Sequence, residues 1–365
     1  MRVLFLVVDG LSPRHVDREV MPALTTLALA GGWSRPGGVG VMPSSTYPNH
    51  ATFATGSPPA AHGIVANQIP TASGAMPSWQ VGLSVPTLFD AMHAAGRQSA
   101  AVFGDGHLVG ATGADNASFL WPVGPHPDGV ALDPLGYAKD RETAAIVVEE
   151  VHSGAELVFA QLNQPDTVAH IFGPDSEEAL CQYGRTDVHV GTIIDSLRAD
   201  WDDWVAIVVS DHSQEPVTEP EPVDLHAAAA GAVGLGGLVL DDGAAAVAGG
   251  ELAHDTGWLT AVDGVEGFQR VGRDVVLVWC GPGRYFSPTE VPVRGVHGSP
   301  RTASQVGVVT GGHPAAKRLG AAISHRRPAA SAWAPTVAGL LGLPPTHRGD
   351  RSVRNDADMG LLGPS

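Results

Sequence analysis

The sequence predicts an α/β fold in which a mostly parallel central sheet is flanked by helices and carries a smaller insertion or cap segment. Two observations lead to this class. Short runs rich in Val, Leu, Ile and Phe are apolar throughout rather than alternating, as expected for strands buried on both faces. Segments with helical patterns lie between these runs, and such alternation is typical of a parallel sheet.

The elements follow one another along the whole chain. The predicted strands are residues 3–8, 157–162, 205–209 and 275–279, with a further apolar strand at 306–309. The predicted helices are residues 85–95, 141–151, 176–199 and 334–341. We therefore expect a single domain over residues 1–365.

Residues 213–295 break this rhythm. They contain a Pro/Glu-rich stretch at 215–222, an Ala/Gly-rich stretch at 227–250 and a hairpin-like turn signal at Asp242-Gly243. No internal repeat accompanies them. We interpret this segment as a possible insertion or cap within the α/β domain.

Composition limits the class of partner. Of the 365 residues, 44% are hydrophobic and 16% are charged, which is enough apolar material for a large globular core. Acidic residues outnumber basic ones by 38 to 21, and the formal charge of -17 repels nucleic acid polymers and anionic membranes. A general preference for solubility would produce the same charge. We expect a small-molecule partner, and the composition leaves the oligomeric state open.

The first apolar run, residues 3–8, is too short to span a bilayer and has no small-residue cleavage site after it. Gly, Pro or charged residues interrupt every other apolar stretch. We expect a cytoplasmic protein that has no membrane partner.

Three aspartates lie at or just beyond the ends of predicted strands: Asp9, Asp166 and Asp211. Ligands of open parallel sheets bind beyond the carboxyl ends of the strands. Two histidines, His170 and His212, lie close to these aspartates in sequence. Helix capping or turn formation would explain any one aspartate alone. Together, the carboxylates and imidazoles predict a metal site.

A second motif supplies a nucleophile. Residues 42–52 read as a Ser/Thr/Pro turn followed by a helix, with Pro48 in its first turn and Thr46 near its N-terminus. The helix dipole there favours negative charge, although a simple threonine N-cap would give the same pattern. A threonine hydroxyl needs a base or a metal to become nucleophilic, so the metal cluster and Thr46 explain each other.

These residues resemble the alkaline phosphatase superfamily, and within it the nucleotide pyrophosphatase/phosphodiesterase branch. The resemblance starts at the Thr46-Tyr-Pro-Asn-His segment and continues through Thr55-Gly56, Pro59 and residues 62–67. It extends through residues 166–174, 210–212 and 296–299, in the family's order. The family commonly has His-Gly-Met where this chain has His-Ser-Gln, and an aspartate where it has Pro300.

The resemblance implies two divalent metal ions, zinc in the first place, with manganese or iron as alternatives. One ion would be held by Asp166, His170 and His297. The other would be held by Asp9, Asp211, His212 and Thr46. Asn67 would bind a phosphoryl oxygen. His313 is an alternative to His297, but the His-Gly-Ser context of His297 favours the latter.

The activity implied is hydrolysis of phosphoryl esters by a phosphodiesterase or nucleotide pyrophosphatase, through a covalent phosphothreonine at Thr46. Alternatives are a phosphomonoesterase acting on a nucleotide or biosynthetic intermediate, and a carbon–phosphorus hydrolase of the phosphonoacetate type. A non-catalytic metal-binding module is a third alternative, from a different class. Trp279, Tyr285 and Phe286 are candidates for lining the organic-group pocket or, alternatively, for packing in the core.

Overall fold

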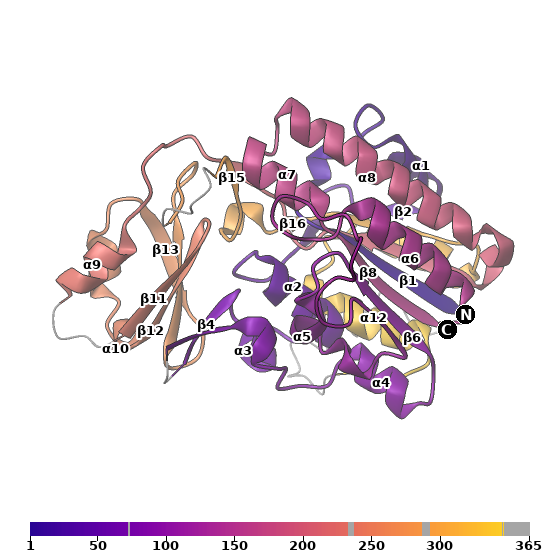
Figure 1. The fold of residues 1–365 in the computed structure, drawn as a ribbon, viewed down its shortest axis with the longest axis horizontal. Helices are drawn as coiled ribbons and strands as arrows, with labels where there is room; N and C mark the ends of the chain where they lie inside the picture. The colour runs from indigo at the N-terminus through magenta and orange to yellow at the C-terminus, as the bar shows by residue number, and fades with distance from the viewer. Residues whose placement is uncertain (72–73, 233–236, 287–292, 345, 347–365) are drawn as a thin grey trace.

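The centre of the fold is a seven-stranded sheet (Figure 1). The computed structural model describes residues 1–71, 74–232, 237–286, 293–344 and 346. In spatial order the strands are β2 (Gly32–Trp33), β17 (Gly307–Thr310), β9 (Trp204–Val209), β1 (Arg2–Val8), β8 (Leu157–Leu162), β6 (Ser99–Phe103) and β7 (Phe119–Trp121). Strands β9, β1, β8, β6 and β7 run parallel. At one edge β17 pairs antiparallel with β9, and β2 pairs antiparallel with β17. The predicted mostly parallel α/β sheet is confirmed.

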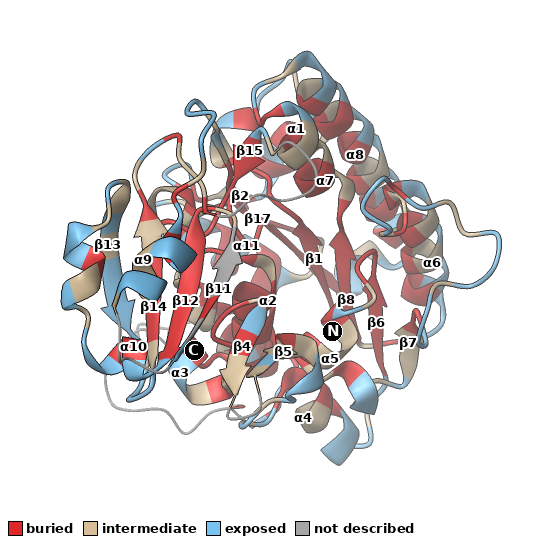
Figure 2. Ribbon diagram, turned by 60° about the vertical axis from the view of Figure 1, so that its left-hand side comes forward, coloured by how far each residue is buried: buried red, intermediate tan, exposed pale blue. Residues whose placement is uncertain are grey.

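Both faces of this sheet are covered because successive side chains of its strands point to opposite sides. In β1, Val3, Phe5 and Val7 belong to one apolar core, and Leu4, Leu6 and Val8 to the other. The first core packs against α2 (Thr46–Thr55), α4 (Leu88–Ala94), α5 (Leu108–Thr112), α11 (Pro314–Ile323) and α12 (Trp333–Leu340). The second packs against α1 (Pro22–Ala30), α6 (Asp140–His152) and α8 (Glu177–Ser196). Figure 2 shows the central strands as buried along their length.

Local signals fix the helix ends. Helix α4 begins at Leu88, three residues later than predicted, because Thr87 and Asp90 form a reciprocal capping box there. Helix α8 begins after Ser176, whose side chain accepts a hydrogen bond from the Ala179 amide. It ends at Ser196, and the chain continues into the 3-10 helix Leu197–Asp203.

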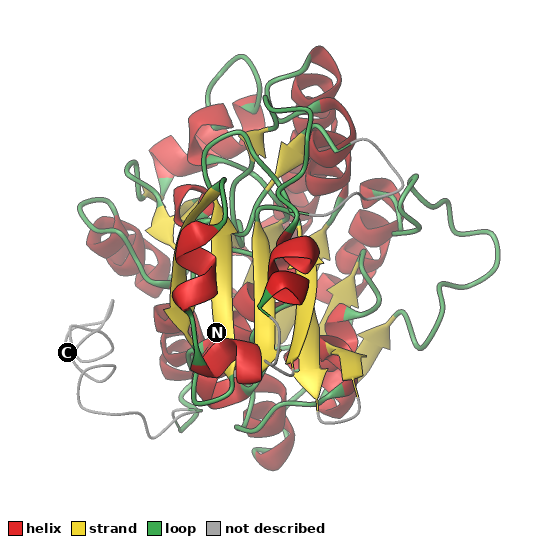
Figure 3. Cartoon of the chain, turned by 90° about the vertical axis from the view of Figure 1, so that its left-hand side faces the viewer, coloured by secondary structure: helices red, strands yellow, loops and turns green. Residues whose placement is uncertain are grey.

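A second, antiparallel sheet stands beside the first. Its order is β11 (Gly237–Asp242), β12 (Ala245–Gly250), β14 (Val275–Cys280) and β13 (Val265–Arg270). The predicted strand at 275–279 therefore exists, but it lies in this sheet rather than in the parallel one. Helices α9 (Leu225–Gly231) and α10 (Glu251–His254) belong to the same part of the chain, and Figure 3 views the molecule from their side. Residues 233–236 and 287–292 of the 213–295 segment lie outside the described residues.

Small elements join the two sheets. The hairpin of β4 (Gln68–Thr71) and β5 (Gly74–Pro77) follows helix α3 (Pro59–His62) and lies next to the second sheet (Figure 1). Ala66, Val247 and Leu277 form a shared apolar cluster at this junction. Two short pairs, β10 (Glu215–Pro216) with β15 (Gly295–Val296) and β16 (Ser304–Gln305) with β3 (Gly38–Val39), complete the connections. None of the helices in the described part of the chain combines the length and apolar character needed to cross a membrane.

Candidate active site

The three strand-end aspartates come from adjacent central strands. Asp9 follows β1, Asp211 lies two residues beyond β9, and Asp166 lies in the first turn of α7 (Gln164–Phe172), which follows β8. Because β9, β1 and β8 are parallel neighbours, their carboxyl ends meet at one edge of the sheet. Asp9 and Asp211 are fully buried or nearly so.

One cluster forms around the His212 imidazole. Its Nε2 atom lies 3.2 Å from Asp211 Oδ2, 3.6 Å from Asp9 Oδ1 and 3.2 Å from Thr46 Oγ1. The other ring nitrogen, Nδ1, is 3.3 Å from the backbone oxygen of Ser213. A proton on Nδ1 would be satisfied by that oxygen, so Nε2 is the nitrogen that faces the carboxylates and the hydroxyl.

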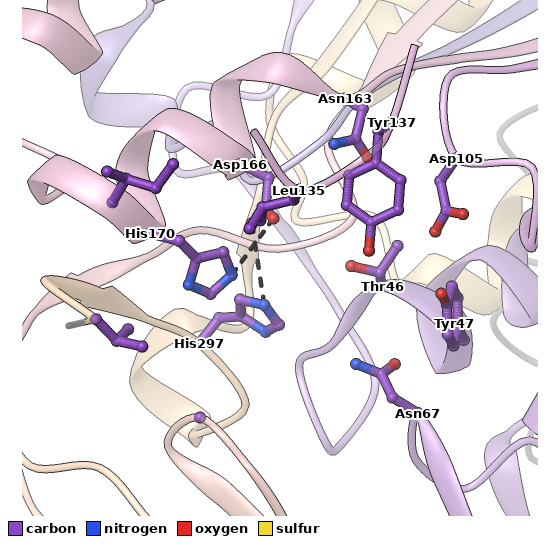
Figure 4. A pocket seen from close by; sticks show the side chains of 13 residues that line it. Thr46, Tyr47, Asn67, Asp105, Leu135, Tyr137, Asn163, Asp166, His170 and His297 are labelled. Atoms are coloured by element: carbon purple, nitrogen blue, oxygen red, sulfur yellow. Dashed lines mark ion pairs between the residues drawn. The ribbon is translucent and has the colours of Figure 1, made fainter. Parts of the chain in front are cut away.

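A second cluster joins Asp166 to two imidazoles (Figure 4). Asp166 Oδ2 lies 3.3 Å from His170 Nε2, one helical turn away, and Oδ1 lies 3.9 Å from His297 Nε2. The Nδ1 atoms face backbone oxygens, that of Gly295 at 2.8 Å for His170 and that of Ser44 at 3.2 Å for His297. This arrangement is typical of metal-ligating histidines, whose second ring nitrogen donates to a carbonyl.

Gly10 allows the two clusters to approach each other. Its φ of +68° lies in the left-handed region, and its amide donates to Asp211 Oδ1 at 3.1 Å. A Cβ atom at this position would lie 2.9 Å from Asp166 Oδ1. Glycine is therefore required by both the backbone turn and the close approach of Asp166.

Burial and neighbouring charges shift the pKa values of the groups in this site. Burial raises the pKa of Asp9 well above its usual value, and the carboxylates of Asp211 and Asp166 raise it further. Burial lowers the pKa of His297 well below its usual range, and His212 lowers it further. Burial alone would raise the pKa of Asp166, but His170 and His297 hold it below its usual range. Burial and the neighbouring carboxylates thus disfavour the ionised form of Asp9, whereas the imidazoles favour that of Asp166.

The donor atoms fit bound cations. Asp9 Oδ2 accepts a hydrogen bond from Gln161 Nε2 at 2.6 Å and Asp211 Oδ1 accepts one from Gly10, so each carboxylate has one oxygen fixed. The other oxygens, Asp9 Oδ1 and Asp211 Oδ2, are buried and receive no hydrogen bond from the described residues. Both face His212 Nε2. Carboxylate and imidazole donors suit zinc, manganese or iron, and a divalent cation would offset the buried negative charge.

Comparison with known proteins identifies the relationship. The model of the type I phosphodiesterase / nucleotide pyrophosphatase family matches residues 3–251. The chain belongs to this family. The resemblance inferred from the Thr46 and strand-end motifs is therefore confirmed.

Two known proteins are similar to this chain in sequence over part of their length. An uncharacterised pyrophosphatase/phosphodiesterase of Schizosaccharomyces pombe is 27% identical over 234 residues, covering 60% of this chain and 45% of the relative. Venom phosphodiesterase of Macrovipera lebetinus is 26% identical over 233 residues, covering 59% of this chain and 26% of the relative. The chain thus spans less than half the length of either relative.

Solved structures show the same fold. Murine ectonucleotide pyrophosphatase/phosphodiesterase 5 superposes with a TM-score of 0.73 at 17% identity, covering 96% of this chain and 98% of that one. Phosphonoacetate hydrolase from Sinorhizobium meliloti 1021 superposes with a TM-score of 0.63 at 19% identity, covering 84% of this chain and 89% of that one. At these identities the likeness establishes the fold and leaves the substrate open.

Several hydrogen bonds hold the segment around Thr46. Helix α2 begins at Thr46, after Ser45 as the N-cap residue. Asn49 Oδ1 accepts from the Val41 amide at 2.9 Å, which fixes the turn before the helix. His50 is fully buried, with Nδ1 2.9 Å from the Thr46 backbone oxygen and 3.6 Å from Asp211 Oδ2. His50 thus links the Thr46 backbone to Asp211.

A cavity of about 400 Å³ opens beside both clusters. Its lining includes the predicted residues Thr46, Asn67, Asp166, His170 and His297 (Figure 4). Asp9, Asp211 and His212 are buried and do not line this cavity, but His212 contacts Thr46, which does.

The structure distinguishes between the alternatives that the sequence left open for three aromatic residues and for His313. Trp279, Tyr285 and Phe286 do not line the cavity; Phe286 is buried in the core of the second sheet, and Tyr285 packs against that core. Tyr47 and Tyr137 line it instead. His313 caps helix α11 by accepting from the Ala315 amide, away from both clusters.

Sequence reasoning missed several residues of the site. Gln161 is fully buried and fixes Asp9, and its signal was the one amide within the apolar run of β8. Asp105 follows β6, a strand too rich in alanine to be predicted. Leu135 and Tyr137 lie in a loop without periodicity, so nothing local to them indicates their place in the cavity wall.

Proposed function

We propose that this chain hydrolyses small phosphoryl esters, as a phosphodiesterase or nucleotide pyrophosphatase that uses Thr46 as the nucleophile. One observation carries the proposal. The hydroxyl of Thr46 and the two unsatisfied carboxylate oxygens of Asp9 and Asp211 meet at His212 Nε2, next to a cavity large enough for an organic group.

Two divalent metal ions, zinc in the first place, fit the two clusters. Asp166, His170 and His297 would hold one, and Asp9, Asp211 and His212 would hold the other together with Thr46. Bound cations supply positive charge that favours the ionised form of a hydroxyl and offsets charge on phosphoryl oxygens.

In the reaction proposed, Thr46 Oγ1 gives its proton to solvent and attacks phosphorus, while the leaving group departs as an oxyanion that takes up a proton from solvent. The bond formed is Thr46 Oγ1 to phosphorus, and the bond broken is phosphorus to the leaving oxygen. Asn67 at the cavity wall would donate to a non-bridging phosphoryl oxygen, and the N-terminal turn of α2 would add its dipole. Water then cleaves the phosphothreonine and restores the hydroxyl.

The relatives support a nucleotide or similar diester as the substrate. An inactive threonine-to-alanine form of murine ectonucleotide pyrophosphatase/phosphodiesterase 5 is known in complex with AMP. Tyr47 and Tyr137 give the cavity of this chain aromatic surface on which a planar group would pack. Phosphonoacetate hydrolase, the other structural neighbour, matches a smaller share of the chain, so carbon–phosphorus cleavage is the second candidate.

The test compares initial rates of zinc- and manganese-loaded protein on p-nitrophenyl monoester and diester substrates and on phosphonoacetate. We expect the diester to be preferred. Thr46→Ala should lower kcat by at least about a thousandfold while the metal content, measured by atomic emission, stays unchanged. Thr46→Ser, which keeps a hydroxyl, should retain measurable turnover.

Full activity of the Thr46→Ala protein would refute the nucleophile. A preference for the monoester or for phosphonoacetate would replace the phosphodiesterase proposal with the corresponding alternative. Absence of turnover in the wild type on all three substrates would contradict the proposal.

A further inference from the structure

One loop forms the wall between two neighbouring cavities. Residues 132–138 close on themselves through an antiparallel bridge between Leu132 and Ala138. Leu135 and Tyr137 of this loop line the cavity at Thr46. The same two residues, together with Asp105, also line a second cavity of about 690 Å³. The conformation of this loop therefore sets the shape of the space available to the organic part of a substrate.

A single buried carboxylate holds the loop. Asp133 is 7% exposed, and its Oδ1 atom accepts hydrogen bonds from the backbone amides of Leu135 at 2.9 Å and Tyr137 at 3.0 Å. The Asp133 amide donates to the Tyr137 oxygen at 2.7 Å. Both wall residues are thus fixed through their backbones by Asp133. Hydrogen bonds to an ionised acceptor are the stronger kind.

The second oxygen of Asp133 ties the loop to the helix that carries Asp166. Thr167, fully buried and next to Asp166 in α7, donates its hydroxyl to Asp133 Oδ2 at 2.7 Å. The Thr167 hydroxyl accepts from Asn163 Nδ2 at 3.0 Å, and Asn163 Oδ1 accepts from Gln161 Nε2 at 2.7 Å.

The chain of hydrogen bonds ends at Asp9, in the cluster around the His212 imidazole. The remaining hydrogen of Gln161 Nε2 is donated to Asp9 Oδ2 at 2.6 Å. Each side chain along this route donates to the next: Gln161 donates to both Asp9 and Asn163, Asn163 donates to Thr167, and Thr167 donates to Asp133. Buried polar networks in which each group is satisfied are rigid and specify one arrangement.

We propose that Asp133 is a positioning residue for substrate specificity. It fixes Leu135 and Tyr137 against the organic group that stays on phosphorus, and it holds them in a fixed position relative to Thr46. The inference rests on the proposed phosphoryl-ester hydrolysis. It concerns substrate recognition rather than the chemical step. Asp133 does not line the cavity, and it acts only by accepting hydrogen bonds from the backbone amides of Leu135 and Tyr137, which do.

A purely structural role of Asp133 would affect all substrates alike, so the test uses two substrates with one leaving group. These are the p-nitrophenyl ester of thymidine 5′-monophosphate and methyl p-nitrophenyl phosphate, in which the retained group is a nucleoside or a methyl group. Asp133→Asn should raise KM for the nucleoside ester by about tenfold, while kcat/KM for the methyl ester changes less than about twofold.

Two further variants sharpen the comparison. Thr167→Val removes the anchoring hydroxyl without touching the loop and should shift KM for the nucleoside ester in the same direction. Asp128→Asn is the matched control, since Asp128 is an exposed carboxylate of the segment leading into the same loop. It should leave both substrates unchanged. Thermal unfolding of each protein checks that it is folded at the assay temperature.

Equal loss on both substrates, or no change on either, would overturn the role of Asp133. If the wild type hydrolyses neither ester, the proposed function fails, and calorimetric binding of AMP and of inorganic phosphate then tests Asp133 separately. Weaker binding of AMP to the Asp133→Asn protein with unchanged binding of phosphate supports the inference. Equal binding of AMP by both proteins, or none by the wild type, overturns it.

Discussion

The buried imidazole of His62 should make stability depend on pH. His62 is fully buried at the end of α3. Its Nδ1 atom accepts from the Ile64 amide at 3.1 Å, and Nε2 lies 3.0 Å from the Thr52 hydroxyl, which itself donates to the Pro48 oxygen. A proton on Nδ1 would break the bond to Ile64 and bury a cation. Burial accordingly lowers the pKa of His62 to about 3.

The free energy of unfolding should fall with falling pH, because the folded and unfolded states bind different numbers of protons. The imidazole of the unfolded chain has a pKa near 6.5, so below that pH the unfolded state binds a proton that the folded state does not. The stabilising effect of neutral His62 is complete above pH 6.5 and is lost as the pH falls toward 3. At about 1.4 kcal/mol per pH unit, the free energy of unfolding should fall by about 2 kcal/mol between pH 7.5 and pH 5 from His62 alone.

The assay is urea unfolding followed by tryptophan fluorescence at pH 7.5, 6 and 5, with wild type and His62→Asn compared at each pH. Asparagine keeps an acceptor near the Ile64 amide and does not titrate. The variant should be less stable by about 2–3 kcal/mol at pH 7.5, and this difference should shrink by about 2 kcal/mol at pH 5. His93→Asn, at an exposed position, is the control. Parallel stability curves for wild type and His62→Asn would refute the reasoning.

Three other predictions concern buried or capping groups. His297→Ala should lose bound metal, whereas His313→Ala, which removes only the cap of α11, should cost about 1 kcal/mol or less and retain the metal. Removing the metal with a chelator should lower the thermal stability of the Asp9→Asn protein less than that of the wild type. The variant has one buried carboxylate fewer whose charge the cation offsets. Burial raises the pKa of Asp140 to about 6, so wild-type stability should fall by about 2 kcal/mol from pH 4 to 6 relative to Asp140→Asn in urea unfolding. Equal responses of the two proteins in any of these three comparisons would contradict the corresponding argument.

The central strands were predictable because they are buried on both faces. Strands β1, β8 and β9 match the predicted runs to within one residue. Strand β6 was missed, since its alanines carry little apolar signal although all five residues are buried. The run at 275–279 was found but assigned to the wrong sheet. An apolar run records burial on both faces, and it contains no information about which strands pair with it.

Part of the candidate site could likewise be predicted from the sequence, and part could not. Asp9, Asp166, Asp211 and the histidines beside two of them could be found because strand ends and helical spacing bring them together through local rules. The cavity wall at Leu135 and Tyr137 could not, because an irregular loop takes its position from distant partners. Its position depends on Asp133 reaching Thr167, 34 residues away in sequence.

The second sheet directly contacts the segment that carries His297. His297 lies beyond the second sheet in sequence, and its backbone oxygen accepts from the amide of Ala244, in the turn between β11 and β12, at 2.9 Å. The next residue, Gly298, has φ +112°, and a Cβ atom there would lie 2.7 Å from that of Ala245. The β11–β12 hairpin and the His297 segment are therefore in close backbone contact. We propose on this ground that residues 213–295 form an insertion within a single domain, because a second sheet that moved independently would carry His297 away from Asp166.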